Sequence, residues 1–153
     1  MLEGRHYQNA YVTRNIAKWL GHFKTHADVR KLLTYEGSIE VWTPAGTLTQ
    51  TSKLAFIWVG DLQYELIEPV SGASLFSDAL PDDDSLQFHH ICNRVDDWDG
   101  FRARVDQQPY PVVLERGGGD ELKFLYLDAR EFLGHYLEYV WATEKLWAQM
   151  GGR

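Results

Sequence analysis

The sequence predicts an α+β fold made of two tandem βαβββ modules, because the chain repeats both its pattern and its residues. Residues 8–15 (QNAYVTRN) are echoed by residues 90–97 (HICNRVDD). Residues 62–67 (LQYELI) are echoed by residues 134–139 (GHYLEY). Each half therefore opens and closes with a similar strand, and each places a stretch of helical periodicity directly after its first strand.

The first module is expected over residues 6–69, from its apolar patterning and its turn residues. Its helix carries apolar residues at helical spacing, which favours one face packed on a sheet: Ile16, Trp19, Leu20 and Phe23. Gly60 and Asp61 mark the turn of an antiparallel hairpin. In order, the expected elements are a strand at 6–13, a helix at about 16–33, and strands at 36–42, 54–59 and 62–68.

A linker rich in Pro, Gly, Ser and Asp is expected at residues 70–87, with room for one short helical turn. The second module is expected over residues 88–142 and repeats the order of the first. Pro109 stops its helix, and the Gly-rich residues 117–119 favour a hairpin turn or a lid. Its expected elements are a strand at 88–95, a helix at 98–107, and strands at 112–115, 122–128 and 135–141. The tail, residues 143–153, is expected to extend into a short helix.

Composition excludes several classes of partner. With 153 residues, of which 44% are hydrophobic, the chain is long enough for a real core. A net charge of -7 argues against a nucleic-acid partner, since phosphate binding needs clustered Lys and Arg. No run approaches the roughly 20 apolar residues of a membrane span, and no signal peptide is evident. A single cysteine, Cys92, fits a reducing compartment. We therefore expect a cytoplasmic protein whose partner is a small molecule.

Four polar side chains stand at matching places on the outer strands of the two modules: Gln8, Glu65, His90 and Glu138. Because successive side chains of a strand alternate between its faces, each of the four is expected to point away from the helix of its module and into a shared concavity. A buried carboxylate is costly unless it is paired or bound to metal. Two carboxylates that face one His form a set that divalent metals such as Zn²⁺, Ni²⁺, Co²⁺, Mn²⁺ and Fe²⁺ accept.

The same alternation assigns further residues to the face of the substrate pocket: Gln63, Cys92, Arg94 and Tyr136. It also predicts that His89 faces the opposite side of its strand from His90 and has a structural role.

At these residues the chain resembles the vicinal oxygen chelate superfamily. This superfamily is built from paired βαβββ modules and includes glyoxalase I, methylmalonyl-CoA epimerase, extradiol dioxygenases and bleomycin-resistance proteins. The resemblance runs from about Tyr7 to Trp141, and its most specific segments are residues 64–69 (YELIEP), 88–97 and 134–139. It implies a curved mixed sheet around a metal-binding pocket, chains that pair into a homodimer, and metal ligands at Gln8, Glu65, His90 and Glu138.

The resemblance also implies a chemistry, in which the metal stabilises an enolate or enediolate while a carboxylate moves a carbon-bound proton. We expect a lyase, isomerase or epimerase of the glyoxalase or CoA-epimerase type, acting on a small oxygenated metabolite, with Glu138 and Glu65 as its catalytic carboxylates. A metal-free binding protein of the resistance type is the alternative. An extradiol-type dioxygenase is disfavoured, because it needs two His and one carboxylate where this chain has Gln8.

Basic residues that could meet an anionic part of the substrate form no clear cluster in the sequence. The candidates are Arg94, Arg102, Arg104, Arg116 and Lys123.

Overall fold

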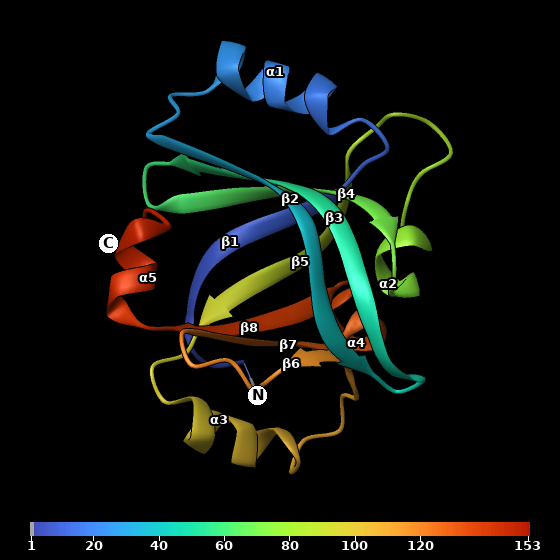
Figure 1. Ribbon diagram of the computed structural model, residues 1–153, viewed down its shortest axis with the longest axis vertical. Helices are drawn as coiled ribbons and strands as arrows, with labels where there is room; N and C mark the ends of the chain where they lie inside the picture. Colours follow the sequence, from blue (N-terminus) through green and yellow to red (C-terminus); the bar gives the residue numbers. More distant parts are fainter. Residues whose placement is uncertain (1) are drawn as a thin grey trace.

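The computed structural model describes residues 2–153, in which eight strands close into a barrel with helices on its outside (Figure 1). Around the barrel the strands follow the order β1-β4-β3-β2-β6-β7-β8-β5. The strands are β1 (Arg5–Val12), β2 (Lys31–Thr43), β3 (Gly46–Val59), β4 (Leu62–Ser71), β5 (Gln87–Arg94), β6 (Val112–Arg116), β7 (Leu122–Leu127) and β8 (Tyr136–Ala142). The helices are α1 (Ile16–His26), α2 (Ser74–Ser77), α3 (Trp98–Val105), α4 (Arg130–Leu133) and α5 (Glu144–Gln149). The predicted α+β fold with a curved mixed sheet is confirmed, and the sheet curves far enough to close on itself.

The two modules, β1–β4 and β5–β8, meet along β1 and β5, which pair antiparallel. Within each module the first strand pairs in parallel with the last, β1 with β4 and β5 with β8. The registers match as well: Glu65 lies opposite Ala10, two residues after Gln8, and Glu138 lies opposite Cys92, two residues after His90. The repeated sequence segments therefore occupy equivalent places in space.

Strands β1 and β5, along which the two modules meet, each carry a β-bulge one residue before Gln8 and His90, respectively. The pairing of β1 with β5 skips Tyr7 on β1 and His89 on β5. A bulge adds one residue to a strand and re-aims a side chain. As a result Tyr7 is buried beside Gln8, and His89 is buried beside His90, where strict alternation would have put one of each pair outside.

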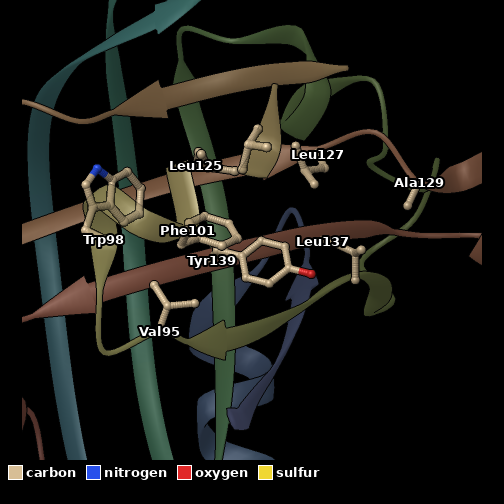
Figure 2. Packing of buried hydrophobic residues seen from close by; sticks show 9 residues of the cluster. Val95, Trp98, Phe101, Leu125, Leu127, Ala129, Leu137 and Tyr139 are labelled. Atoms are coloured by element: carbon tan, nitrogen blue, oxygen red, sulfur yellow. The ribbon is translucent and has the colours of Figure 1, made fainter. Parts of the chain in front are cut away.

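Helices α1 and α3 cover the outside of the barrel on opposite sides (Figure 1). Helix α1 packs its apolar face on buried residues of β3 and β4, which are Ala55, Ile57 and Leu66. Helix α3 buries Trp98, Phe101 and Val105 against β7 and β8, in a cluster that includes Leu125, Leu127, Leu137 and Tyr139 (Figure 2). The outward faces of the strands thus supply much of the core, which leaves the inward faces free to line a cavity.

Several boundaries differ from the prediction. Helix α1 ends at His26 instead of near residue 33, because Leu32 and Leu33 enter β2 and pair with β3. Strands β2 and β3 have 13 and 14 residues and are longer than predicted. Their central residues are polar and resemble a loop, but Gln50 and Ser52 of β3 point into the barrel and are buried. Helix α4 was not predicted, whereas α2 lies in the linker and α5 in the tail, where short helices were expected.

The barrel encloses a cavity of about 720 Å³ that opens beside β2. Strand β2 meets β6 at a single pair, Trp42 and Glu115, so the wall along residues 31–41 has no continuous backbone pairing on that edge. Tyr35 lines the cavity and is 48% exposed, which places the mouth at this edge. In the described part of the chain no helix is both long and apolar enough to cross a membrane.

Candidate metal centre

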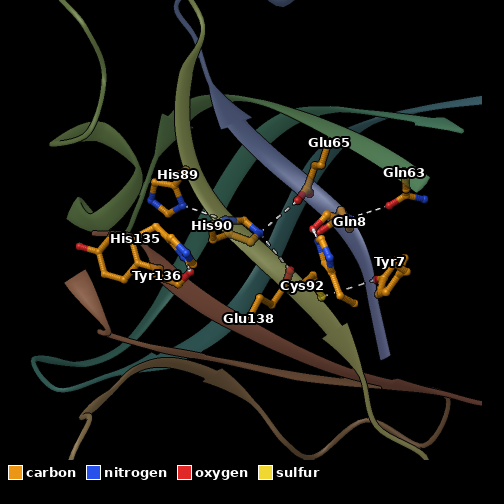
Figure 3. A network of polar contacts seen from close by, with 11 residues as sticks. Tyr7, Gln8, Gln63, Glu65, His89, His90, Cys92, His135, Tyr136 and Glu138 are labelled. Atoms are coloured by element: carbon orange, nitrogen blue, oxygen red, sulfur yellow. Dashed lines mark hydrogen bonds and ion pairs between the residues drawn. The ribbon is translucent and has the colours of Figure 1, made fainter. Parts of the chain in front are cut away.

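Four side chains from the four equivalent strands converge inside the barrel (Figure 3). His90 Nε2 lies 3.1 Å from Glu138 Oε2 and 3.5 Å from Glu65 Oε2. Gln8 completes the group from β1, and its amide is 3.3 Å from the Oε2 atom of each carboxylate. All four residues are buried. The structure thus brings together the complete set that the sequence predicts as metal ligands.

The amide of Gln8 can face this group in two ways. With its nitrogen donating to Gln63 Oε1 at 2.6 Å, its oxygen points at the two carboxylates and has no donor within reach. Turned by 180°, the amide nitrogen would instead donate to Glu65 and Glu138. Buried oxygens that face one another repel unless a cation or an N–H group stands between them. The first orientation is therefore the one that suits a bound cation.

The donor set fits a divalent metal in kind and in spacing. Potential ligand atoms of Glu65, His90 and Glu138 all lie within 4.8 Å of one another. Ligands on opposite sides of one ion are about 4 Å apart when each bond is about 2.1 Å, so only a small adjustment separates this arrangement from coordination. Two carboxylates, one imidazole and one amide oxygen form an oxygen-rich set, which suits an open, reactive site better than a closed structural zinc site.

Electrostatics in the group depend on how burial and the mutual charges balance. Burial alone would lower the pKa of His90, but the hydrogen bonds to Glu138 and Glu65 outweigh it and raise the pKa to about 9. Burial, opposed by the hydrogen bond from His90, raises the pKa of Glu65. Without metal, His90 therefore carries the positive charge that the two carboxylates require.

His89 fixes which nitrogen of His90 faces the carboxylates. His89 Nε2 lies 2.8 Å from the carbonyl oxygen of Leu75, which only accepts, so Nε2 carries the hydrogen. Burial, followed by the charge on His90, lowers the pKa of His89 to about 3, so its ring is neutral at pH 7 and its Nδ1 accepts. The 2.8 Å contact between the two Nδ1 atoms is then donated by His90. His90 Nε2 is left to face the carboxylates, as metal coordination would require.

Two tyrosines extend the group. The ring of Tyr126 on β7 meets the His90 ring edge-on, with centroids 4.9 Å apart, and its hydroxyl lies beside Glu138. Burial, followed by the charges of Glu138 and Glu65, raises the pKa of Tyr126 well above its ordinary value. Tyr7 lines the cavity beside Gln8, and its hydroxyl is 3.7 Å from the sulfur of Cys92. Both hydroxyls are therefore protonated at neutral pH and available as donors.

Only one of the four predicted pocket residues lines the cavity. Gln63 does so, and its Oε1 accepts a hydrogen bond from the amide of Gln8. Cys92 points inward as predicted but is fully buried in a cluster with Tyr7, Trp58 and Trp147. Tyr136 packs against the ring of His89 and is covered by Arg130. For Cys92 and Tyr136 the prediction of a pocket position is wrong, because aromatic side chains already fill the space around them.

The prediction for Arg94 is also wrong. Arg94 lies at the end of β5, where its guanidinium stacks on Trp147 at 4.4 Å and pairs with Glu144 of α5. It borders a smaller surface hollow of about 260 Å³ instead of the main cavity. Strand alternation gave its direction correctly, but it could not show that the C-terminal helix closes this end of the barrel.

Sequence reasoning missed the role of His89, which was expected to face away from His90. The cause is the bulge at His89, which breaks the alternation on which that expectation rested. The pair His89-His90 in the sequence is a weak signal of such an irregularity, since two adjacent polar residues in a buried strand cannot both face outward.

Comparison with known proteins identifies the family of the chain. The family model for the glyoxalase/bleomycin resistance protein/dioxygenase superfamily matches residues 7–126. The chain belongs to this superfamily. A search among curated protein sequences gives no match to the chain.

Solved structures share the superfamily fold at low sequence identity. A hypothetical protein from Bacillus halodurans C-125 matches with a TM-score of 0.68 and 20% identity, over 92% of this chain and 95% of the other. Methylmalonyl-CoA epimerase from Mycobacterium tuberculosis matches with a TM-score of 0.65 and 17% identity, over 97% of both chains. A variant of Streptomyces coelicolor methylmalonyl-CoA epimerase, in complex with 2-nitronate-propionyl-CoA, matches with a TM-score of 0.64 and 15% identity, over 92% of this chain and 96% of the other.

Proposed function

We propose that this superfamily member is a metal-dependent isomerase, epimerase or lyase that moves a carbon-bound proton next to an oxygen of a small metabolite. The single observation that carries the proposal is the burial of Glu65, His90 and Glu138 in one group whose ligand atoms lie within 4.8 Å of one another. A cavity that only binds an apolar compound has no physical reason to hold two buried carboxylates, because their desolvation is costly.

Gln8, Glu65, His90 and Glu138 would hold the ion, which supplies Lewis acidity at the oxygen atoms of the substrate. Glu65 and Glu138 come from different modules, so a carboxylate is available from each half of the barrel to accept or return a proton. The mostly apolar cavity wall limits the access of water to the reacting group.

The fold neighbours named as methylmalonyl-CoA epimerases support the epimerase version of this chemistry, and the superfamily supports the lyase version. Branched CoA thioesters and adducts of α-oxoaldehydes with thiols are therefore the first substrates to assay. Homodimer formation and a cytoplasmic location stay predictions from the sequence.

The proposal is tested first by metal analysis of protein purified without chelator and without metal affinity resin. We expect about one divalent ion per chain, lost in both His90→Ala and Glu138→Ala. Matched controls are His22→Ala and Glu131→Ala, which alter the same residue types at exposed positions and should keep the ion. Exchange of the α-proton of the candidate substrates in D₂O, followed by NMR, then measures the reaction.

A metal-free binding protein is the second candidate, and the size and apolar lining of the 720 Å³ cavity favour it. This candidate becomes the better account if the native protein holds no metal even after reconstitution with Ni²⁺, Co²⁺, Zn²⁺, Mn²⁺ and Fe²⁺.

A further inference from the structure

The basic side chains of the barrel separate into one that lines the cavity and others that are engaged elsewhere. Four of the five candidates from the sequence have acidic or aromatic partners away from the cavity: Arg94 with Glu144, Arg102 with Glu115, Arg104 with Glu3, and Lys123 with Trp141. Within residues 2–153, Arg116 is the only Lys or Arg among the residues that line the cavity. The cavity thus has one permanent positive charge besides the metal centre.

Arg116 has donors to spare. Its Nη1 donates to the carbonyl oxygen of Leu122 at 3.0 Å, which anchors the side chain between the ends of β6 and β7. Among the described residues no carboxylate oxygen lies within 4 Å of its guanidinium, so Arg116 forms no salt bridge with them. A guanidinium has five N–H donors, so most of them can bind a ligand.

Strand register fixes how far Arg116 lies from the centre. Leu114, Tyr126 and Glu138 form one row across β6, β7 and β8, and Arg116, Phe124 and Val140 form the next inward-facing row. Arg116 and Glu138 are separated by two strand spacings across the sheet and by one row along the strands. Their Cα atoms therefore lie about 12 Å apart. The wall between them is formed by Phe124 and Tyr126 of β7 and Val140 of β8, and Leu122 continues it beyond Arg116.

We propose that Arg116 binds a terminal carboxylate of the substrate, so that the substrate is an elongated organic acid. Its carboxylate meets Arg116, an apolar segment of several atoms follows the wall, and an oxygen-bearing head reaches the metal centre. The position of the head rests on the proposed function, whereas the carboxylate subsite does not. The planar fork of Arg116 matches a carboxylate. A dianionic phosphate would bring a second negative charge toward Glu65 and Glu138, in a chain whose net charge is already -7.

The test uses probes that lack the oxygen-bearing head, so that it does not depend on the metal. We would compare 4-phenylbutanoate, the neutral 4-phenylbutanamide and 3-phenylpropyl phosphate, each titrated into chelator-treated protein by calorimetry. The carboxylate should bind about tenfold or more tightly than the amide, as expected for a charged hydrogen-bonded pair. Arg116→Gln should abolish this preference while the affinity for the amide is kept. Lys123→Gln makes the same charge change on β7, outside the cavity, and should leave the preference intact.

Three results would overturn the proposal: no carboxylate preference in the native protein, including no binding of any probe; a preference that survives Arg116→Gln; or tighter binding of the phosphate than of the carboxylate. Metal content is measured separately. A protein without metal that still discriminates through Arg116 would contradict the proposed function alone, and a protein with metal that does not discriminate would contradict the carboxylate subsite alone.

Discussion

The charge on His90 should make the metal-free protein less stable as the pH rises above neutrality. His90 donates to Glu138 and lies near Glu65, and these contacts outweigh burial and raise its pKa to about 9. In the unfolded chain a histidine titrates at about 6.5. Below 6.5 both states hold the proton, so the contribution of His90 to folding is fully present. Between 6.5 and 9 only the folded state holds the proton, so stability is lost as the pH rises.

The magnitude follows from the width of this window. Each pH unit well inside this window costs about 1.4 kcal/mol, and the slope is smaller near its ends, where one state is only partly protonated. A rise from pH 6.5 to pH 8.5 should therefore lower the free energy of unfolding by about 2 kcal/mol. Cys92 contributes only above the pKa of an unfolded thiol, about 8.5, so the window stops there.

Urea unfolding of chelator-treated protein, at half-unit steps from pH 6.5 to pH 8.5, measures the effect. His90→Gln should remove most of the slope, because the residue that holds the extra proton is gone. His22→Gln changes an exposed histidine on α1 and should keep the native slope. A native protein whose unfolding free energy is flat over this window, or a His90→Gln variant with the full slope, would refute the electrostatic account of the centre.

Two further predictions concern the centre and the backbone. Metal binding should release about one proton at pH 7 to 8, because His90 must lose the hydrogen on Nε2 before it coordinates the ion. Calorimetry in buffers of different ionisation enthalpy counts that proton. A binding heat that does not depend on the buffer would contradict the assignment of His90 as a ligand. The change from Gly to Ala should have opposite effects at two sites, as measured by thermal or urea unfolding. Gly21→Ala, inside α1, leaves nothing within 4 Å of the added methyl and should stabilise the protein by about 0.5–1 kcal/mol. Gly134→Ala, at φ +81° after α4, should destabilise it by about 1 kcal/mol.

Much of the fold could be predicted because both modules repeat the same order of elements, and the alternation of side chains along their strands shows which face is covered by a helix. Alternation along β4 and β8 correctly put Leu66, Leu137 and Tyr139 against helices and Glu65 and Glu138 inside the barrel. The lengths of β2 and β3 could not be predicted from local sequence. Gln50 and Ser52 of β3 are polar but buried inside the barrel, and β2 pairs with β3 along its whole length although its central polar residues are exposed.

The sequence predicted that the four candidate ligands lie together, but it did not predict their surroundings. Gln8, Glu65, His90 and Glu138 could be chosen by matching one module to the other, which requires no knowledge of loops or bulges. The assignment of Arg94 failed because α5, which follows β8, lies over the end of the neighbouring strand β5, and the sequence pattern did not show where this tail packs. His89 was misplaced because a bulge shifts the phase of side chains, and phase was the only information available.

The pseudo-symmetry of the barrel has a consequence for how its centre could arise. Gln8 and His90 occupy equivalent places on β1 and β5, yet they differ in chemistry, and the bulge residues beside them, Tyr7 and His89, differ as well. Two identical copies of a single module would be bound to offer the same residue twice. Because the two modules belong to one chain, each half can differ independently, and a pocket built from equivalent but unlike halves can distinguish one end of an asymmetric molecule from the other.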